Sequence, residues 1–382
     1  MQTLADVYAL PREITDFREA ISQICVARVA PRAAEIDETA EYPWDVRRLF
    51  AEYDILGLPF PVEYGGTGTG TLMLNVAIEE IAKSCASSAL ILMVHELGTL
   101  PIQLFGTDEQ KQRLLPRCAS GEWSPAFALS EPDAGSDPGG MITSAVPAGD
   151  GGWVLNGTKN WITNLGVADF YIVFAVTDRE NRRITAFIVE SDRPGFSIGK
   201  LERKLGIRGS PTGQPSFADV HVGPENVLGE VGQGMRVALT TLERTRLGAG
   251  AQALGLAQGA TDYAVGYARE RRQFGRAINE FQAIQLKLAD MELRTAAGRE
   301  LLYRACAMVD RQEPGAGKYA SMAKVFSSDT EMYVTVDAIQ VLGGNGYVKE
   351  YPVEWMMRDA KITQIYEGTN EIQRLVIARS LR

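Results

Sequence analysis

The chain has 382 residues, of which 45% are hydrophobic and 23% are charged, and its formal net charge is −9. This length allows two or three domains with cores of their own, and the composition is that of an ordinary globular protein. The acidic balance, without a basic tail or stripe, excludes nucleic acid as the main partner because phosphate binding needs clustered Lys and Arg.

The sequence indicates neither export nor a membrane. Its four cysteines are scattered and form no CxxC pair, so we expect no disulfide framework and a cytoplasmic location. The opening stretch MQTLADVYALPREI lacks the basic start and apolar core of a signal peptide. We also identify no apolar run long enough to cross a bilayer.

The first predicted domain, residues 1–121, is helical. Its opening helix carries a core-facing stripe at alternating spacings of three and four residues. The stripe consists of Ile14, Phe17, Ile21 and Ile24 and is extended by Cys25 and Val29. We expect Pro31 to interrupt this helix. The glycine-rich residues 63–71 follow no clear strand and lack the GxGxxG order, so we interpret them as a turn.

The second predicted domain, residues 122–232, is rich in strand signals. The segments DFYIVFAVTD, RITAFIVES and SFADVHV read as strands separated by polar turns. Asn156-Gly157 stands between two short aromatic and β-branched runs, which predicts a β-hairpin. Because no helical pattern interrupts these segments, we expect a small antiparallel sandwich or barrel.

The third predicted domain, residues 233–382, returns to helix. Another stripe steps by three and four residues, at Phe281, Ile284, Leu288 and Met291. After Gly368, the spacing of Asn370 and Gln373 predicts a capping box for a last helix. Long antiparallel helices favour a bundle. The predicted fold class is therefore α+β, with an N-terminal helical domain, a middle antiparallel β domain and a C-terminal helical bundle.

The sequence contains few of the residues that several common kinds of active site require. The chain has only two histidines, His95 and His221, which is too few for a His-rich metal site and leaves little for a Ser-His-Asp triad. We expect His95 to be a satisfied core residue and His221 to be exposed on a strand. There is no P-loop, and we predict no metal site.

Three short segments offer groups for chemistry. FALSEPDAGSD, residues 127–137, ends in a turn of small residues that lets backbone N–H groups approach a ligand, although a linker would look similar. NWITN, residues 160–164, places an aromatic and a hydroxyl on one strand face, or packs a core Trp. QIYEGTNEIQ, residues 364–373, sets Glu367 before a helix, as a catalytic base or as a helix-stabilising charge.

Together these segments resemble the acyl-CoA dehydrogenase family. ALSEPDAGSD is similar to its first signature and QIYEGTNEIQR to its C-terminal signature, while ERRQFG, QVLGGNGY and YPVEWMMRDAKI match it in the same order and spacing. The resemblance covers nearly the whole chain. It implies an N-terminal helical domain, a middle β domain and a C-terminal four-helix bundle, assembled as a homotetramer of two dimers.

The resemblance also implies an FAD site. Next to the flavin would lie Phe127, Leu129 and Ser130, with Trp161 covering the ring and Thr163 near its N5. The pyrophosphate and adenine part would be held across a dimer interface by Arg271, Gln273, Phe274, Phe281, Gln282, Gln340, Gly343 and Gly344. A planar, always-charged guanidinium suits a pyrophosphate. Thr369 and Glu371 would meet the cofactor from the other side.

The implied reaction removes a proton from Cα and a hydride from Cβ of an acyl-CoA thioester. Glu367 would take the proton, and its backbone N–H would help to stabilise charge on the thioester carbonyl. Some members carry the base on an earlier helix, at the position of Thr245, which cannot serve as one. The implied substrate contacts are Ser136 with the pantetheine, Glu243 and Arg246 with the acyl-CoA, Tyr366 as a pocket wall and Gly368 beside the thioester.

The acceptor implied by the resemblance is an electron-transfer flavoprotein, and the segment KLGIRGSPT is closest to short-chain and branched-chain bacterial members. Met93 and Thr99 would influence the depth of the acyl pocket. Alternatives on the same fold are an acyl-CoA oxidase and a biosynthetic acyl-thioester dehydrogenase. Ser88, where a glutaryl-CoA-type enzyme needs an arginine, disfavours that activity. DNA-binding relatives carry an additional basic domain that this sequence lacks.

Overall fold

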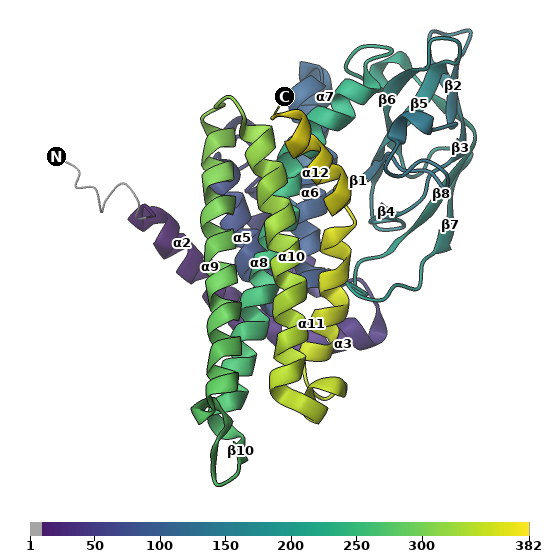
Figure 1. Ribbon diagram of the computed structural model, residues 1–382. Coiled ribbons are helices and arrows are strands. Elements are labelled where there is room, and N and C mark those ends of the chain that lie inside the picture. The colour runs from purple at the N-terminus through teal and green to yellow at the C-terminus, as the bar shows by residue number, and fades with distance from the viewer. Residues whose placement is uncertain (1–9, 382) are drawn as a thin grey trace, which may run out of the picture.

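The computed structural model describes residues 10–381. Helices from both ends of the chain pack into one elongated body, and the strand-rich middle part stands beside one end of it (Figure 1). A helical part, a β part and a second helical part thus follow one another along the chain, which confirms the predicted order.

The N-terminal part is helical, as predicted. Its helices are α2 (Arg12–Ile24), α3 (Ala33–Thr39), α4 (Trp44–Glu52), α5 (Gly70–Ser84), α6 (Ala86–Phe105) and α7 (Asp108–Ala119). The expectation that Pro31 interrupts the first helix needs correction. The chain stays helical through a π-helical turn at Cys25–Val29 and a 3₁₀ turn at Ala30–Arg32 before α3 begins. Pro31 lacks an N–H, so it changes the hydrogen-bonding pattern there without ending the helical path.

The glycine-rich residues 63–71 form a turn, as predicted. A 3₁₀ turn at Val62–Tyr64 leads into glycines at positive φ, which L residues with side chains rarely adopt. α5 begins at Gly70, at the end of this stretch, and a residue of a distant helix accepts hydrogen bonds from two of its first backbone N–H groups. Thr71 N and Leu72 N donate to the Asp310 carboxylate at the end of α9, at 2.7 and 3.1 Å.

Helix α6 corrects the expectation that no apolar run could cross a bilayer. Among residues 10–381, α6 is the one helix that is long and apolar enough to do so by length and composition. Most of it is buried, and it packs against α7, α8 and β1. Its apolar character is therefore that of a core helix inside the helical body.

The β part forms one nine-stranded sheet. Its strands are β1 (Pro125–Ala128), β2 (Ser144–Pro147), β3 (Trp153–Thr158), β4 (Ile162–Thr163), β5 (Phe170–Asp178), β6 (Arg183–Glu190), β7 (Phe196–Leu201), β8 (Thr212–Val222) and β9 (Val227–Leu228). The order is β4-β8-β3-β2-β5-β6-β9, with β1 on β5 and β7 on β8. Both β1 and β2 pair with β5 in parallel, so the sheet is mixed and not purely antiparallel. The long connections from β1 and β2 to β5 permit this.

Asn156-Gly157 does not turn the chain, so the predicted hairpin is wrong. Both residues lie inside β3, where the pairing with β8 shifts between Leu155 and Gly157 as a β-bulge. Gly157 has φ 148°, and a Cβ on it would lie 2.5 Å from Thr143 Oγ1. Asn156 exchanges hydrogen bonds of 2.9 and 3.0 Å with Asp219 on β8. The residues that suit a tight turn therefore serve a bulge between neighbouring strands.

The C-terminal part is built on three long helices. Its elements are α8 (Gly234–Glu270), the hairpin β10 (Arg272–Gln273) and β11 (Arg276–Ala277), α9 (Gln282–Asp310), α10 (Ala316–Leu342), α11 (Val353–Ala360) and α12 (Asn370–Arg379). The predicted capping box is wrong. Thr369 is the N-cap of α12 and accepts a 3.3 Å hydrogen bond from Ile372 N, whereas Asn370 and Gln373 are buried.

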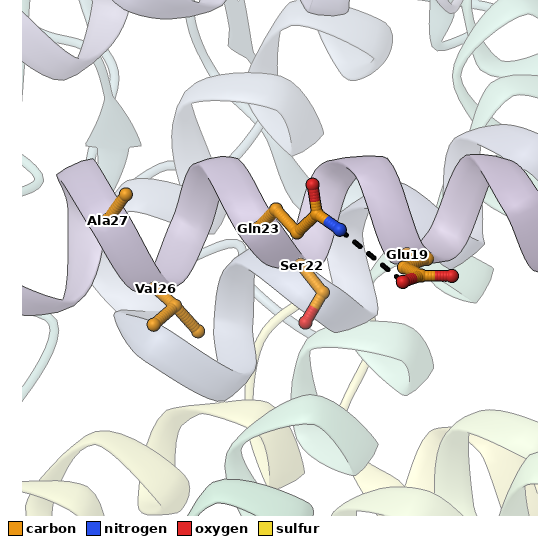
Figure 2. A pocket seen from close by; sticks show the side chains of 5 residues that line it. All are labelled: Glu19, Ser22, Gln23, Val26 and Ala27. Carbon is orange, nitrogen blue, oxygen red and sulfur yellow. Dashed lines mark hydrogen bonds between the residues drawn. The ribbon is translucent and has the colours of Figure 1, made fainter.

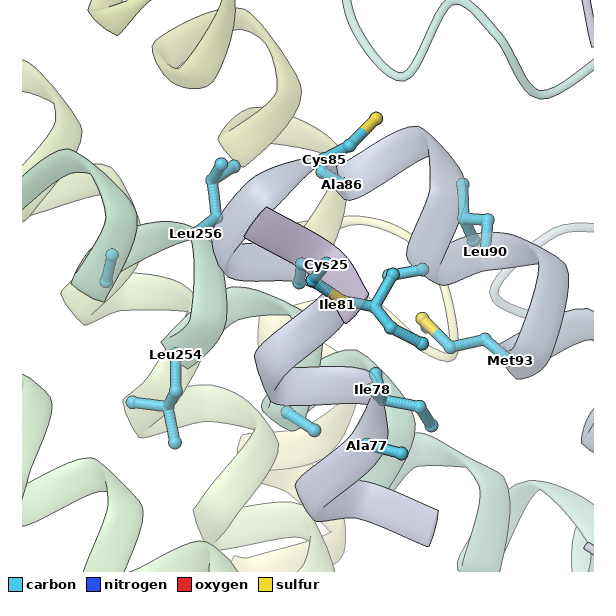
Figure 3. Packing of buried hydrophobic residues seen from close by; sticks show 14 of the residues in the cluster. Cys25, Ala77, Ile78, Ile81, Cys85, Ala86, Leu90, Met93, Leu254 and Leu256 are labelled. Carbon is cyan, nitrogen blue, oxygen red and sulfur yellow. The ribbon is translucent and has the colours of Figure 1, made fainter. Parts of the chain in front are cut away.

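The two helical parts share one hydrophobic core. Figure 3 shows Ile78 and Ile81 of α5 packed near Met93 of α6 and beside α8. The backbones of α5 and α8 approach closely, because a Cβ on Gly255 would lie 2.1 Å from the Glu79 carbonyl oxygen. Small residues at this crossing thus fix α8 against the N-terminal helices. That fixed position matters for function, because the first half of α8 contributes to the candidate site.

Candidate active site

Glu367 lies in the short loop between the 3₁₀ turn Lys361–Gln364 and α12. It has φ 54° and Gly368 has φ 85°, so two consecutive residues are left-handed. For a residue with a Cβ this conformation is uncommon and costs ~1–3 kcal/mol, so its surroundings must stabilise it. The Glu367 Oε2 atom accepts a 3.1 Å hydrogen bond from Thr245 Oγ1 on α8.

The environment of Glu367 suits a base. Burial raises the pKa of Glu367, while the Thr245 hydrogen bond and the charges of Arg246 and Lys324 act in the opposite direction. A carboxylate with a raised pKa is a stronger base than an exposed one. The two cations favour the ionised form that must be present before a proton can be accepted.

Arg246 follows Thr245 on α8 and is only 6% exposed, so it is not a surface arginine. Its Nη1 atom donates to Ser321 Oγ and to Gln373 Oε1, both at 2.7 Å. Gln373 Nε2 in turn donates to the Glu367 carbonyl oxygen at 2.9 Å. Arg246 therefore supports the loop of Glu367 through Gln373, which the sequence analysis did not identify as a site residue.

Tyr366 precedes Glu367, and its hydroxyl group is already hydrogen-bonded within the protein. It donates to Gln252 Oε1 on α8, and Gln252 Nε2 donates to the Ala86 carbonyl oxygen at 2.8 Å. Burial, followed by nearby carboxylates, raises the pKa of Tyr366 well above its usual value, so its phenol stays protonated. The residue is thus a neutral, fixed wall next to Glu367.

Helix α6 connects Glu367 with the β part. Glu96 on α6 is buried and close enough for the charge of Glu367 to raise its pKa. Two residues further along, a Cβ on Gly98 would lie 2.4 Å from Pro125 Cβ at the start of β1. Helix α6 therefore packs against the start of β1 and carries a buried carboxyl group near Glu367.

The FALSEPDAGSD and NWITN segments lie side by side in the β part. Asn160 N donates to the Ser130 carbonyl oxygen at 2.8 Å, so Leu129 and Ser130 lie beside the NWITN segment. Trp161 and Thr163 do not share one regular strand face as predicted. Trp161 precedes β4 with φ 61°, and it leaves 59% of its surface exposed. An exposed tryptophan here is not core packing.

A buried ion pair supports this region and was missed by the sequence analysis. Lys159 Nζ donates to Glu131 Oε1 at 2.8 Å and to the Leu129 carbonyl oxygen at 3.1 Å. Glu131 also accepts from Ile142 N and Thr143 N, at 2.7 and 3.0 Å. Burial would raise the pKa of Glu131, but Lys159 and the N–H donors outweigh this and lower it. The pair closes the loop that follows β1.

A second group of predicted residues lies at the far end of the helical body, around the β10–β11 hairpin (Figure 1). The hairpin exposes Arg271 and Gln273, and Phe274 is 93% exposed. Asn345 Nδ2 donates to Tyr267 Oη at 2.7 Å, which joins the turn after α10 to this end of α8. The predicted residues Gln340, Gly343 and Gly344 lie at the end of α10 and in this turn, so they are at the same end of the helical body. Phe281 and Gln282 lie at the start of α9.

The two groups of predicted FAD residues are far apart within one chain. Arg246 and Glu270 lie on the same helix, α8, and are separated by about 24 residues, or ~36 Å at 1.5 Å per residue. The hairpin therefore cannot reach a ligand held near Glu367 of its own chain. Both groups can serve one cofactor only if a second copy of the chain supplies one of them.

Other predicted residues occupy varied positions. Phe127 is buried in β1 and packs against Phe174 with ring centroids 5.0 Å apart, so it contributes to the core. The Thr369 hydroxyl is engaged as the N-cap of α12. Ser136, Glu243 and Glu371 are exposed. Of these three, Glu243 is on α8 two residues before Thr245, and Glu371 is in the first turn of α12.

The remaining polar candidates form no second site. His95 is buried and bonded to the Cys118 carbonyl oxygen at 2.8 Å, and His221 is exposed on β8, as predicted for both. No metal-binding group of His, Cys, Asp and Glu occurs among residues 10–381. A hollow on α2 and the following turn is lined by Glu19, Ser22, Gln23, Val26 and Ala27 (Figure 2). Glu19 is its single titratable group and pairs with Gln23.

Comparison with known proteins gives consistent matches along the chain. Residues 11–122, 126–220 and 232–382 match the acyl-CoA dehydrogenase N-terminal, middle and C-terminal domains. The chain is 45% identical over 378 residues to the probable acyl-CoA dehydrogenase FadE25 of Mycobacterium tuberculosis, covering 98% of this chain and 97% of that protein. It is 44% identical over 374 residues to the short-chain-specific acyl-CoA dehydrogenase of Clostridium acetobutylicum, with coverage of 97% and 98%.

Solved structures agree with these relatives. Butyryl-CoA dehydrogenase from Megasphaera elsdenii superposes with a TM-score of 0.95 at 43% identity, covering 98% of this chain and 99% of that chain. A chain from the work on the electron transferring flavoprotein of Acidaminococcus fermentans gives the same TM-score and coverage at 42% identity. The FAD complex of PigA gives a TM-score of 0.93 at 28% identity, covering 98% of each chain.

The helix–sheet–helix architecture around a half-buried carboxylate is that of a flavin-dependent oxidoreductase. With all three domains matched and relatives of 45% identity over nearly its whole length, the chain belongs to the acyl-CoA dehydrogenase family. It is an enzyme of that family, and its cofactor is FAD. This confirms the family, the fold class and the cofactor inferred from the sequence.

The residues present fit FAD. Trp161 is exposed and so offers an aromatic face to a flat ring, and Thr163, two residues further on in β4, carries a hydroxyl that suits its polar edge. Arg271 is exposed and makes no ion pair within residues 10–381, so its guanidinium is available to a pyrophosphate.

Proposed function

We propose that this acyl-CoA dehydrogenase oxidises a short- or branched-chain acyl-CoA to the trans-2-enoyl-CoA in the cytoplasm, with Glu367 as the base and an electron-transfer flavoprotein as the acceptor. One observation carries the role of Glu367. Its carboxylate is held by Thr245 on α8, lies near two buried cations and has a pKa raised by burial. By the resemblance to the family, Thr245 stands where a subset of members carries its base, and a threonine cannot accept a proton at neutral pH.

The chain's own residues would bind and orient the substrate and take its α-proton. Glu367 would accept the α-proton while its backbone N–H donates to the thioester carbonyl, which lowers the cost of the developing negative charge. Tyr366 would wall the acyl pocket, because its hydroxyl is already engaged by Gln252. Gly368 would leave space for the thioester, and Ser136 and Glu243 would contact the CoA part. FAD, when bound, supplies the hydride acceptor.

We propose that FAD lies between two copies of the chain. Leu129, Ser130, Trp161 and Thr163 would contact the flavin in one copy. The second copy would hold the pyrophosphate and adenine part with Arg271, Gln273, Phe274, Phe281, Gln282, Gln340, Gly343 and Gly344. The ~36 Å along α8 from Arg246, beside the Glu367 loop, to Glu270, beside the hairpin, supports this division. Thr369 and Glu371 would complete the site. We further propose a homotetramer of two dimers and domain boundaries after residues 121 and 232.

The short-chain proposal rests on the names of relatives. They include an acyl-CoA dehydrogenase called short-chain specific and a butyryl-CoA dehydrogenase, both more than 40% identical to this chain. The acceptor proposal draws on the superposed chain from work on an electron transferring flavoprotein. A panel of acyl-CoA chain lengths, assayed with that flavoprotein and with O₂ as acceptors, tests both. A preference for long chains, or for O₂, would contradict them.

Glu367→Gln tests the base. The amide keeps the size and hydrogen-bonding reach of the side chain but cannot accept a proton at neutral pH. We expect FAD content and acyl-CoA binding to be retained, while flavin reduction by butyryl-CoA and isobutyryl-CoA slows by ~10²–10⁴-fold in stopped-flow measurements. The exposed Glu180→Gln is the matched control. Reduction at the wild-type rate in Glu367→Gln would move the base elsewhere, with Glu243 as the next carboxylate to test.

A further inference from the structure

Lys324 on α10 is a buried cation that the proposed chemistry does not use. Its side chain is 0% exposed. Within residues 10–381 it forms no direct ion pair, and its Nζ atom donates instead to the Gly368 carbonyl oxygen at 2.8 Å and to Asn370 Oδ1 at 2.9 Å. Removing a charge from water is costly unless the site compensates for it. The burial of this lysine therefore calls for a functional or structural explanation other than packing alone.

The partners of Lys324 are themselves fixed. Asn370 Nδ2 donates to Asp329 Oδ1 at 2.8 Å and lies 2.9 Å from Ser328 Oγ, so the amide has one orientation. Ser328 and Asp329 follow Lys324 on the same helix. The first turn of α12 is thereby tied to α10, and polar groups of the protein surround the ammonium group.

The polar surroundings of Lys324 include the Glu367 loop. The Gly368 carbonyl accepts from Lys324, and the Glu367 carbonyl accepts from Gln373 at 2.9 Å, which Arg246 holds at 2.7 Å. Both carbonyls of the left-handed pair are therefore anchored, one directly by a cation and one through Gln373. Fixing both carbonyls fixes the planes of the Glu367–Gly368 and Gly368–Thr369 peptide bonds, and with them the left-handed backbone that carries the Glu367 side chain.

The charge of Lys324 also acts on the Glu367 carboxylate. The titratable and charged groups around it are Glu367 in the loop, Arg246 on α8, Asp329 and Glu331 on its own helix and Glu371 on α12. Burial lowers the pKa of Lys324 to about 8, against the influence of Glu367, so the ammonium form persists near neutral pH. Its presence opposes the upward shift of the pKa of Glu367.

We propose that Lys324 is a positioning residue for the base: it anchors the left-handed Glu367–Gly368 backbone and supplies the buried positive charge that keeps the Glu367 carboxylate ionised. This inference rests on the proposed role of Glu367. A purely structural role, in which Lys324 only ties α12 to α10, would change stability but would not change how the rate depends on pH.

The test compares Lys324→Met, Lys324→Arg and the exposed control Lys361→Met as FAD-loaded enzymes. The first readout is the pH dependence of kcat/KM with butyryl-CoA. The second is deuterium incorporation at the α-carbon of butyryl-CoA in D₂O, measured by mass spectrometry without an electron acceptor. Exchange reports proton abstraction by Glu367 separately from turnover.

We expect Lys324→Met to move the acidic limb of both profiles upward by about one pH unit, because removing a nearby positive charge raises the pKa of a carboxyl group. Exchange should fall about tenfold on the acidic side and recover at high pH. Lys324→Arg should keep the wild-type limb with a lower plateau, and it remains informative if the methionine variant does not fold. Lys361→Met should match wild type.

Three results would overturn the proposal: an unshifted limb in Lys324→Met, a rate lowered equally at every pH, or a shifted limb in Lys324→Arg. Glu367→Gln separates this inference from the function on which it rests. If Glu367→Gln exchanges normally, Glu367 is not the base. If it abolishes exchange while Lys324→Met keeps the wild-type limb, only the role of Lys324 is wrong.

Discussion

Thr245 Oγ1 on α8 donates a 3.1 Å hydrogen bond to the Glu367 carboxylate, which lies 122 residues further along the chain. This bond favours the ionised form, so it opposes the effect of burial on the pKa of Glu367. Thr245→Val keeps the shape and removes the donor. We expect the acidic limb of the kcat/KM profile to rise by ~1 pH unit, since a hydrogen bond to a charged group contributes ~1.5–3 kcal/mol.

Thr245→Ser is the matched control, because it keeps the hydroxyl and loses only a methyl group. Its acidic limb should stay near that of the wild type. A valine variant whose profile coincides with the wild type at every pH would show that this hydrogen bond does not act on the base.

The hairpin between α8 and α9 provides a second prediction. Arg271→Ala should weaken FAD binding and the dimer together, because Arg271 is exposed and lies ~36 Å along α8 from the site of its own chain. Flavin content after gel filtration and the mass from light scattering measure the two effects. Arg48→Ala, an exposed arginine on α4, is the control. Full flavin occupancy with an unchanged oligomer would refute the assignment across an interface.

The sequence predicted the helices well where apolar residues recur on one face, as from Ile14 to Ile24 in α2. The prediction from sequence failed where a short segment is compatible with two different backbone structures. Asn156-Gly157 suits a hairpin and equally suits a bulge, and the close contact of Gly157 with Thr143, just before β2, depends on a segment that the dipeptide itself does not indicate. The parallel pairing of β1 with β5 was likewise hidden, because it depends on how the chain returns and not on either strand alone.

Motifs in the sequence predicted the residues of the candidate site, whose roles stay predictions, but they did not indicate the residues that support it. Glu367 stands inside a recognisable segment, whereas Lys324 and Lys159 look like ordinary surface lysines in a helix and before a strand. Their burial depends on acceptors far along the chain, such as the Gly368 carbonyl 44 residues after Lys324. A buried lysine cannot be identified without knowing which oxygen atoms the fold brings to it.

The buried pair Glu131–Lys159 provides a third prediction. Lys159→Met leaves the Glu131 carboxylate buried without its cation, which typically costs ~3–5 kcal/mol of the free energy of unfolding. Because the pair closes the loop after β1, FAD content should fall as well. Thermal unfolding and flavin absorbance measure both effects.

The double variant Lys159→Met with Glu131→Gln is the informative partner, since it removes the unpaired charge and should recover part of the lost stability. If the double variant is less stable than Lys159→Met by the full cost of Glu131→Gln alone, the two side chains are not coupled. The ion pair would then have no special part in holding the loop.

Glu96 on α6 provides the last prediction, on stability as a function of pH. It is 6% exposed, and burial, then the charge of Glu367, raises its pKa to about 8, with Arg244 opposing. A raised pKa in the folded state means that its stabilising contribution is complete below the unfolded value near 4.5 and is lost as the pH rises to about 8. Glu96→Gln removes the ionisation and therefore this loss.

We expect Glu96→Gln to unfold at nearly the wild-type temperature at pH 5 and at a higher temperature at pH 8. The gain in the free energy of unfolding at pH 8 should be at most a few kcal/mol, at ~1.4 kcal/mol per pKa unit. Glu52→Gln, an exposed residue of α4, should show no such pH-dependent difference. A Glu96→Gln variant that is no more stable than wild type at pH 8 would show that the folded protein ionises Glu96 without cost, so that this carboxyl group near the proposed base is already charged at neutral pH.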